Sequence, residues 1–505
     1  MTLNRTFTLS QLPLMPFGFF LMACLLSVLA PAQVTFNGAS SVNMRSQAVG
    51  SAGAAVALSF TIEANTTVGS IAVLTTGIAG KDFSQATGST CTAMTYETTT
   101  SCVVNVTFKP LATGSRRGAV VFYSGAAKTR TALATVPVFG IGTGPQVVFS
   151  PSGAATNVGS NFISPQGVAV DAAGNVYVTD IGLQEVFKIT PRGTQTTVGK
   201  GLEVPEDVAV DGAGNVYITD SQADAVFKVT PGGVQTTVGK GFSYPVGIAI
   251  DGAGNVYVSD PFVPTVFRIT PSGGKSMVGS GYNTPAGVAV DAAGNVYVAD
   301  TFDATVFKIT RSGKQTMIGS GLISPSGVAV DAAGDVYVTD SATNTVYEIT
   351  PGNVQNTVSS GLDVPNVIAI DGLGNLYVAD TFNSQVTKID RADPPSLTFD
   401  ATKIGSTSKD SPKTVEVENI GNASLNFSAL SYPTDFPEAS GDNECTSSTS
   451  LIAASNCSLI INFSPVTPFT GSSNLLTEAV KLTTDDLNVP KKIQKVVVSG
   501  EELQK

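Results

Sequence analysis

Aspartates recur at two fixed positions in the middle of the chain, and they are the side chains there with most capacity for chemistry. One column ends segments of the type GVAVD, and the other ends segments of the type NVYVTD. The two columns are Asp171, Asp211, Asp251, Asp291, Asp331 and Asp371, and Asp180, Asp220, Asp260, Asp300, Asp340 and Asp380. A ring of carboxylates could bind calcium or another hard cation, because such ions prefer oxygen ligands.

The alternative is that each aspartate forms a tight turn by accepting hydrogen bonds from backbone N–H groups of the connection that follows it. Identical repetition in every unit favours the turn, because a fold needs sameness and a site normally needs asymmetry. We therefore assign no metal ligand and no cofactor, and structural calcium stays an open alternative.

The absence of histidine restricts the chemistry further. Histidine is the commonest general base and the usual zinc ligand, and it activates the nucleophile in Ser-His and Cys-His enzymes. We assign no catalytic residue. The net charge of −11 also argues against nucleic acid as a partner, because phosphate binding needs a basic surface.

A repeat with a period of 40 residues positions the aspartates, and each unit opens with a proline, at Pro165, Pro205, Pro245, Pro285, Pro325 and Pro365. Four short segments in each unit, such as GVAVD, NVYVTD, VFKIT and QTTVG, have the composition of strands. Connections such as DAAGN and TPSGG are made of turn residues. The period is typical of a solenoid or propeller, so we expect an all-β fold with one four-stranded blade per unit.

The two ends of the repeat predict how the ring closes. The sixth unit stops at Asp390, before its outer strand. Residues 147–160 align with the second half of a unit at the same offset, so that Pro151 corresponds to Pro191. We expect this segment to supply the strand that the last blade lacks, because closed propellers leave no free strand edge.

The phrase P-x-G-V-A-V-D-x-x-G-N-V-Y-V-x-D stands nearly intact in all six units and resembles the NHL repeat. It departs at Asn366 and Val367, which replace x-Gly, and at Asp335, which replaces Asn. NHL proteins form six-bladed propellers that commonly act as binding platforms. The resemblance therefore implies a six-bladed β-propeller over residues 145–390.

The two flanks of the repeat also resemble each other. Each contains a cysteine pair, then alternating apolar residues, then Phe-x-Pro and a turn with glycine. Together with the segment VEVENIGNASLNF, this pattern resembles the immunoglobulin-like choice-of-anchor D family of bacterial exported proteins. The resemblance implies immunoglobulin-like β-sandwiches at 33–144 and 391–505, on either side of the propeller.

Residues 1–32 have the order of a secretory signal peptide, with Arg5, the apolar run FGFFLMACLLSVLA and a small-residue stretch ending at Ala32. We expect their removal on export, which places the protein outside the cell, at the cell surface or in the periplasm. A membrane anchor fits less well, because the run is short for a spanning helix of roughly 20 residues. Lipidation at Cys24 stays open, since LMAC weakly resembles a lipoprotein cleavage box.

The other four cysteines form two pairs that are close in sequence, Cys91 with Cys102 and Cys445 with Cys457. An even number in an exported chain, absent from the repeat, predicts two local disulfides. Each would stabilise its sandwich by roughly 3 kcal/mol through closure of a short loop.

The connections of the repeat separate into two rims. DAAGN and TPSGG lie on one rim and are nearly uniform, whereas the second-to-third connections and the links between blades lie on the other rim and differ in every unit. The repeated tyrosines lie between valines in the second strand, so we expect core residues whose hydroxyls need a partner. We therefore expect one face to be scaffold and the other, which we call the variable face, to carry function.

Five aromatic residues on the variable face are candidate contacts for a protein or a glycan. Phe262, Phe302 and Phe382 share one loop position, and Tyr244 and Tyr282 lie in the links between blades. The alternative is that each phenylalanine packs into its neighbouring blade.

The residue after each repeat proline is expected at the mouth of the central channel, and its polar variants include Gln166, Glu206 and Asn366. These three are candidate contacts for a small ligand. Similar propeller folds include gluconolactonases, whose sites can be made from Glu and Asn around a metal, and lyases that depend on histidine.

Two functions from different classes follow. The first is a secreted or cell-surface binding or scaffold protein whose partner is a protein or a cell-envelope glycan. The second is a metal-dependent lactonase- or lyase-like enzyme, against which the absence of histidine counts. We expect a monomer with no transmembrane helix in the mature chain.

Overall fold

The computed structural model describes residues 33–125, 131–153, 155–466, 474–486 and 493–503. Over these ranges the chain is all-β, and its one helical element is the short 3-10 turn η1 (Thr381–Asn383). No helix in these ranges is long and apolar enough to span a membrane. The expected signal peptide, with Cys24, lies outside the described residues.

The chain before the repeat forms two main sheets with orders β1-β3-β9-β7 and β2-β11-β10-β5-β6, and β4 pairs with β8. Their apolar faces pack together, with the ring centroids of Phe60 and Phe122 4.6 Å apart. The predicted disulfide between Cys91 and Cys102 is confirmed. The strands are β1 (Val34–Phe36), β2 (Val42–Ala48), β3 (Val56–Ile62), β4 (Thr66–Thr67), β5 (Ser70–Thr75), β6 (Ile78–Ala79), β7 (Phe83–Gln85), β8 (Thr95–Tyr96), β9 (Thr100–Phe108), β10 (Gly114–Tyr123) and β11 (Ala132–Thr143).

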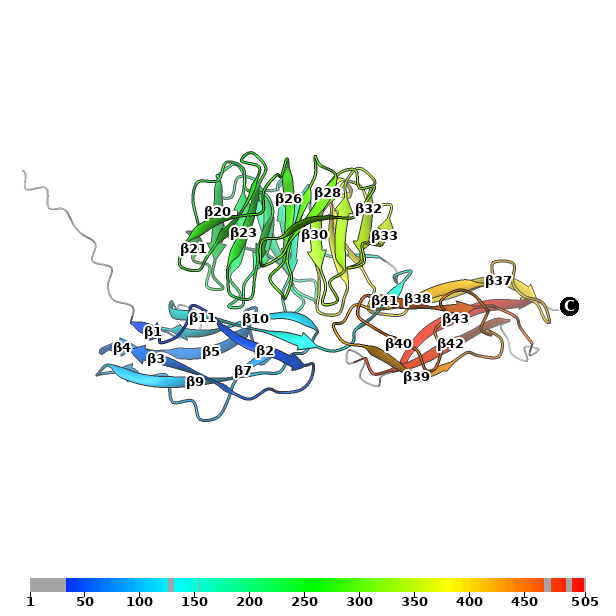
Figure 1. Cartoon of the computed structure of the whole chain (residues 1–505), viewed down its shortest axis with the longest axis horizontal. Coiled ribbons are helices and arrows are strands. Elements are labelled where there is room, and N and C mark those ends of the chain that lie inside the picture. The colour runs from blue at the N-terminus through cyan, green and yellow to red at the C-terminus, as the bar shows by residue number, and fades with distance from the viewer. Residues whose placement is uncertain (1–32, 126–130, 154, 467–473, 487–492, 504–505) are drawn as a thin grey trace, which may run out of the picture. The chain divides into compact units, whose positions relative to one another are not determined.

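The repeat forms six four-stranded antiparallel sheets. The first strands contact one another in sequence order, and β34 contacts β14, so they surround a common axis as in a β-propeller (Figure 1). These strands are β14 (Pro165–Val170), β18 (Pro205–Val210), β22 (Ile248–Ile250), β26 (Pro285–Val290), β30 (Pro325–Val330) and β34 (Pro365–Ile370).

The second strand of each sheet is buried along its whole length, which explains its density of Val and Tyr. The second strands are β15 (Val176–Asp180), β19 (Val216–Asp220), β23 (Val256–Asp260), β27 (Val296–Asp300), β31 (Val336–Asp340) and β35 (Leu376–Asp380). The third strands are β16 (Glu185–Ile189), β20 (Ala225–Val229), β24 (Thr265–Ile269), β28 (Thr305–Ile309), β32 (Thr345–Ile349) and β36 (Gln385–Ile389).

The outer strands of five sheets come from the end of the same unit: β17 (Gln195–Thr197), β21 (Gln235–Thr237), β25 (Lys275–Val278), β29 (Gln315–Ile318) and β33 (Gln355–Ser360). The sixth outer strand is β13 (Thr156–Asn157), which pairs antiparallel with β36. The N–H of Val158 extends this pairing by donating to the carbonyl of Val386 (2.9 Å). An upstream segment therefore completes the last sheet, as the alignment predicted.

The first part of that upstream segment behaves differently from the prediction. Val147–Ser150 forms β12, which pairs with β38 (Lys413–Asn419) of the C-terminal region and not with the propeller. Its Phe149 is fully buried in the core of that region. The placement of residues 147–150 in the propeller is therefore wrong, because an apolar strand pairs with whichever edge buries its side chains.

The C-terminal region contains a sheet of order β37-β43-β42-β39-β40 and the three-stranded sheet β12-β38-β41. A core of apolar side chains packs between them, and the predicted disulfide between Cys445 and Cys457 is confirmed. The remaining strands are β37 (Ser396–Lys403), β39 (Leu425–Ser431), β40 (Ser450–Leu451), β41 (Ser455–Ile461), β42 (Leu475–Thr484) and β43 (Ile493–Leu503).

Candidate functional site

Asp171 shows the role of the first column of aspartates. Its Oδ1 accepts hydrogen bonds from the N–H groups of Ala173 (2.8 Å) and Asn175 (3.0 Å). Its Oδ2 accepts from Asn175 Nδ2 (2.7 Å) and from the Tyr177 hydroxyl (3.1 Å). The carboxylate thus closes the turn and is also the partner that the core tyrosine needs. The same set of bonds is made by Asp211, Asp251, Asp291 and Asp371.

The second column of aspartates stabilises the loops of the variable face. Asp180 is fully buried, and its carboxylate accepts hydrogen bonds from the N–H groups of Ile163 (2.8 Å), Ser164 (3.1 Å) and Leu183 (3.1 Å). It therefore ties the link between blades to the loop that follows the second strand. Within the described ranges, no group of three or more Asp, Glu, His or Cys side chains is placed to hold a metal ion.

The rim of uniform turns meets the N-terminal sandwich. The N–H of Ala172 donates to Thr76 Oγ1 (2.8 Å). A Cβ atom on Gly212 would lie 2.2 Å from the carbonyl oxygen of Gly118, so a larger residue at 212 would clash with β10. The small residues of these turns are therefore needed for contact between the domains as well as for the turns themselves.

The C-terminal region contacts the same rim. The N–H of Ala333 donates to the carbonyl of Ile420 (3.0 Å). A Cβ atom on Gly374 would lie 2.5 Å from the Ile420 side chain. The uniform rim is thus the side of the propeller that contacts both flanking regions. Among the described residues, neither flanking region is seen to cover the variable face in this way.

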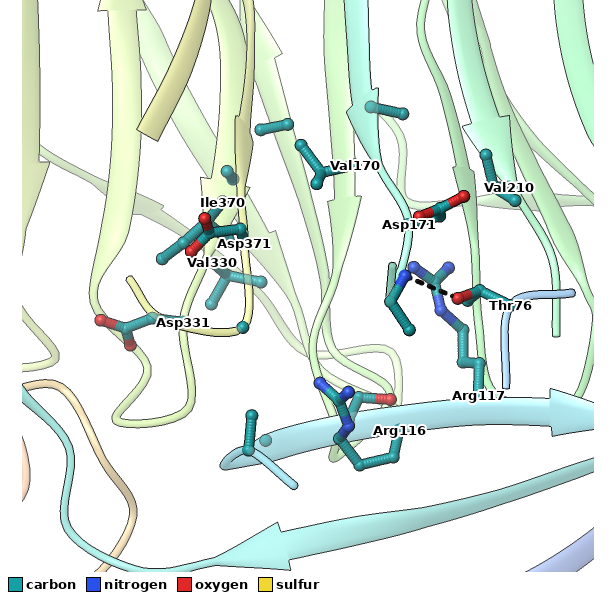
Figure 2. A pocket seen from close by; sticks show the side chains of 18 of the residues that line it. Thr76, Arg116, Arg117, Val170, Asp171, Val210, Val330, Asp331, Ile370 and Asp371 are labelled. Carbon is teal, nitrogen blue, oxygen red and sulfur yellow. Dashed lines mark hydrogen bonds between the residues drawn. The ribbon is translucent and has the colours of Figure 1, made fainter. Parts of the chain in front are cut away.

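A cavity of about 620 Å³ lies where the first strands approach the N-terminal sandwich (Figure 2). Figure 2 shows Arg116 and Arg117 of β10 pointing from the sandwich toward the strands. Arg116 is paired with Asp82 (Nη2 to Oδ2, 2.7 Å), and Arg117 Nη1 donates to the Ile250 carbonyl (2.5 Å). Apolar side chains from the first strands form the walls, among them Val170, Val210, Val330 and Ile370. We assign this cavity no ligand.

The three loop phenylalanines are strongly exposed. Phe262, Phe302 and Phe382 have exposed fractions of 71%, 74% and 71%. The alternative that each packs into its neighbouring blade is therefore wrong. The buried aspartate at the end of the second strand holds the base of the loop, since Asp260 Oδ1 accepts from the N–H of Val263 (3.4 Å) and Asp300 Oδ1 from the N–H of Asp303 (3.3 Å).

Tyr244 and Phe262 form a stacked pair. Their ring centroids lie 4.7 Å apart with an interplanar angle of 20°. Tyr244 is half-buried, so it supports the outer ring while one part of it stays accessible. The pair joins the link before β22 to the loop after β23.

Tyr282 is not part of this surface, and its prediction as a contact residue is wrong. It is only 7% exposed, its hydroxyl donates to the carbonyl of Val278 (3.0 Å), and its ring packs edge-on against Phe307. The equivalent residues of the other units are large and apolar, and they are also buried: Phe162, Leu202, Phe242, Leu322 and Leu362. The apolar residues at this position in the other units indicated a core position, and the prediction of Tyr282 as a contact residue did not use them.

The three polar residues predicted at the channel mouth are half-buried but do not converge. Asn366 Nδ2 donates to Gln166 Oε1, which joins the last sheet to the first. Glu206 Oε1 accepts a hydrogen bond from the Ser221 hydroxyl (2.7 Å) and thus belongs to a separate group.

Asp207 is a residue of this mouth that the sequence analysis missed. Four units have glycine at this position, and a Cβ atom there would clash, as at Gly247, where it would lie 2.3 Å from the Ala286 carbonyl oxygen. Asp207 Oδ2 accepts a hydrogen bond from the N–H of Ile248 (3.0 Å) in the next sheet. Its departure from glycine was visible in the repeat.

Burial raises the pKa values of the neighbouring carboxyl groups of Glu206 and Asp207. Desolvation raises the pKa of Asp207 to about 7, although the N–H groups of Ile248 and Val208 offset part of the effect. Desolvation also raises the pKa of Glu206, and hydrogen bonds from Ser221 and Tyr244 offset part of it. The mouth therefore carries two adjacent carboxyl groups in a poorly solvated environment.

Comparison with protein families matches residues 322–346 to the NHL repeat. The chain therefore contains an NHL repeat within a propeller fold. No curated protein matches the chain.

Several solved structures are similar to part of the chain. They include a virginiamycin B lyase from Staphylococcus aureus, with 16% identity, a TM-score of 0.39 and coverage of 48% of this chain and 89% of that one. A gluconolactonase from Xanthomonas campestris has 14% identity, a TM-score of 0.43 and coverage of 49% and 94%. A protein of unknown function from Bacteroides thetaiotaomicron has 15% identity, a TM-score of 0.41 and coverage of 72% and 99%. At these scores, none of them bears on the function of this chain.

Proposed function

We propose that this is an exported binding protein that uses the variable face of a six-bladed NHL propeller to bind a protein or a cell-envelope glycan. The observation that carries the proposal is the exposure of Phe262, Phe302 and Phe382 at one shared loop position. On this proposal the flanking regions are immunoglobulin-like sandwiches of the choice-of-anchor D type. The two disulfides support an oxidising compartment outside the cytosol.

Covering these exposed rings would contribute free energy to the binding of a partner. Burying a phenylalanine side chain is worth roughly 1.5–3 kcal/mol relative to leaving it in water. A folded monomer gains little hydrophobic stabilisation from rings that are more than 70% exposed, whereas a complex with a partner that covers them gains it. Aromatic residues are also enriched among the side chains that dominate binding energy at interfaces.

The division between the two rims supports the same function. The uniform turns contact both flanking regions, as Ala172 does with Thr76 and Ala333 does with Ile420. The rigid ring then presents loops whose sequences differ in every unit, and such loops on a rigid scaffold are where binding residues concentrate.

The test compares phenylalanine variants with matched controls in the exported chain. Phe262→Ala, Phe302→Ala and Phe382→Ala, combined, should weaken retention on immobilised peptidoglycan, envelope polysaccharide or a purified envelope protein at least about tenfold. Met277→Ala and Met317→Ala remove equally exposed apolar side chains, 72% and 69%, from the outer strands β25 and β29. These controls should bind like the unaltered protein, and equal loss in both sets would contradict the proposal.

A second candidate is a metal-dependent lactonase- or lyase-like activity at the channel mouth. The observation that favours it is Asp207, a buried carboxyl whose pKa is raised to about 7, next to Glu206. A metal at this mouth would be offered the carboxylates of Glu206 and Asp207, since the amides of Gln166 and Asn366 are bonded to each other. Turnover of a lactone that is lost on chelation and in Asp207→Gly would support this candidate, and turnover unaffected by both would remove it.

A further inference from the structure

We propose that Glu206, Tyr244 and Phe262 form a binding site for the cationic side chain of a basic polypeptide, with arginine as the preferred residue. This inference deepens the proposed function and rests on it. We call these three residues, with Ser221, the cation site.

The cation site is assembled from two neighbouring sheets. Glu206 lies in β18 and accepts a hydrogen bond from the hydroxyl of Ser221 (2.7 Å). Ser221 directly follows β19 and is buried. Tyr244 lies near enough to offset part of the rise that burial causes in the pKa of this carboxyl. Because Tyr244 also stacks on Phe262, one surface carries a carboxylate beside two aromatic faces.

The Glu206 carboxylate accepts a hydrogen bond from the Ser221 hydroxyl but has no cationic partner among the described residues. No ion pair in the described ranges includes Glu206. The adjacent Asp207 adds a second acidic group, and its bonds go to backbone N–H groups. A cation that enters this group would offset the cost of desolvating two neighbouring carboxyls, which burial now imposes.

The aromatic pair adds a second attraction for the same ligand. A cation over the face of a tyrosine or phenylalanine is attracted by the ring quadrupole, and arginine can stack on the ring while its planar fork reaches a carboxylate. This protein already uses such contacts internally, since Lys188 lies 5.2 Å from the centroid of the Tyr177 ring.

The surrounding face has the charge that a basic polypeptide needs. The loops and links of the variable face carry more exposed or half-buried acids than bases, namely Glu203, Asp224, Asp303 and Asp363 against Lys200 and Lys240. An extended basic segment could contact several of these acids, and only its arginine side chains have the planar group that can stack on Phe262 while reaching Glu206. Charge together with the geometry of the guanidinium therefore favours a polypeptide over an amine-bearing glycan.

The experiment measures binding of the exported chain to a fluorescent peptide with spaced arginines. Its comparison ligands are the same peptide with glutamine in place of arginine, and an oligomer of glucosamine. We expect the arginine peptide to bind at least about tenfold more tightly than the glutamine peptide, and the affinity to fall as salt increases. Preference for the glucosamine oligomer would overturn the choice of polypeptide.

Variants locate the binding. Glu206→Gln and Phe262→Ala should each weaken binding of the arginine peptide about tenfold, with circular dichroism and thermal melting as checks on folding. Glu416→Gln makes the same charge change at an exposed position of β38 and should have no effect. If Glu206→Gln binds the peptide as the unaltered protein does, the cation site is wrong.

Failure of this inference can be separated from failure of the proposed function. If Glu206→Gln has no effect but the combined phenylalanine variant still loses retention on its ligand, the variable face binds a partner by other contacts. If neither change alters any binding, both proposals fail.

Discussion

Arg391 Nη2 lies 2.6 Å from Glu418 Oε2, and this buried ion pair joins the end of the propeller to β38 of the C-terminal region. Arg391 also contacts Glu348 of β32 (Nη1 to Oε1, 3.3 Å), so one guanidinium bridges two carboxylates from different regions. Arg391 is 2% exposed. It is therefore the charged centre of the junction.

The fifth unit of the repeat is altered to receive this arginine. Glu348 stands where every other unit has lysine or arginine, and Asp335 stands where every other unit has asparagine. Arg391 lies 5.2 Å from the centroid of the Tyr337 ring, the place that a lysine of the same unit occupies over the tyrosine in three other units. The linker thus supplies the cation that the unit itself has lost.

Arg391→Met should destabilise the junction by about 3–5 kcal/mol, because it leaves buried carboxylates without their partner. Chemical denaturation followed by a probe in the C-terminal region measures this change. Lys388→Met removes a partly exposed pair with Asp390 and should change stability by no more than about 1 kcal/mol. Similar effects of the two substitutions would refute the account of the junction.

Stability of the junction should fall as the pH rises. Asp335 is fully buried, and burial, followed by the charges of Asp331 and Glu348, raises its pKa to about 9. In the unfolded chain the pKa of an aspartate is about 4. Between pH 4 and pH 9 the folded protein therefore keeps a proton on Asp335 that the unfolded chain has lost. The free energy of unfolding is highest below pH 4 and decreases as the pH rises toward 9. Thermal melting between pH 5 and pH 9 should therefore show a steady decrease.

Asp335→Asn restores the residue of the other units and should remove the part of this pH dependence that comes from Asp335. Asp331 and Glu418, whose pKa values burial also raises to about 8, should keep their part. The new amide can donate to Asp331, as Asn175 Nδ2 donates to Asp171 Oδ2 (2.7 Å). At pH 8 we expect a gain of about 1–3 kcal/mol over the unaltered protein. Asp303→Asn, at an exposed position, should leave the pH profile unchanged, and a profile that is equally steep in Asp335→Asn would contradict the assignment.

Closure of the ring by β13 can be tested at Val158. Val158→Pro removes the N–H that donates to the Val386 carbonyl and should cost about 1–3 kcal/mol, whereas Val158→Ala keeps that N–H. Hydrogen exchange in β36 should become faster in the proline variant than in the alanine variant. Equal exchange in both would mean that the upstream segment does not hold the last sheet.

The disulfides should stabilise the flanking regions independently of the propeller. Both cysteines of each pair lie in the apolar core of their own region. Replacing Cys91 and Cys102 by serine should lower the stability of the N-terminal sandwich by roughly 3 kcal/mol. Limited proteolysis should then cut this sandwich first, and early cleavage within the repeat would show that the propeller depends on the bridge.

The repeat made much of the fold predictable. A fixed period aligned six copies of each strand, so weak local signals reinforced one another, and the turn function of Asp171 followed from its repetition. The same columns held information that went unused, since Tyr282 occupies a position that is apolar in the five other units and Asp207 replaces a glycine.

Other features depend on contacts that no local pattern reveals. The strand 147–150 has the same apolar character whether it pairs with the propeller or with β38, and only the assembled domains decide between them. The charges of Glu348 and Arg391 are visible in the sequence, but their meeting with Glu418 depends on how the C-terminal region folds back.

Hydrogen exchange of the protein, with and without the ligand that retains it, tests the central claim most directly. The account predicts protection of residues 261–265, 301–305 and 381–385, the loops that carry Phe262, Phe302 and Phe382, with none in the outer strands β25 and β29. Protection confined to the outer strands or to the flanking sandwiches would contradict it.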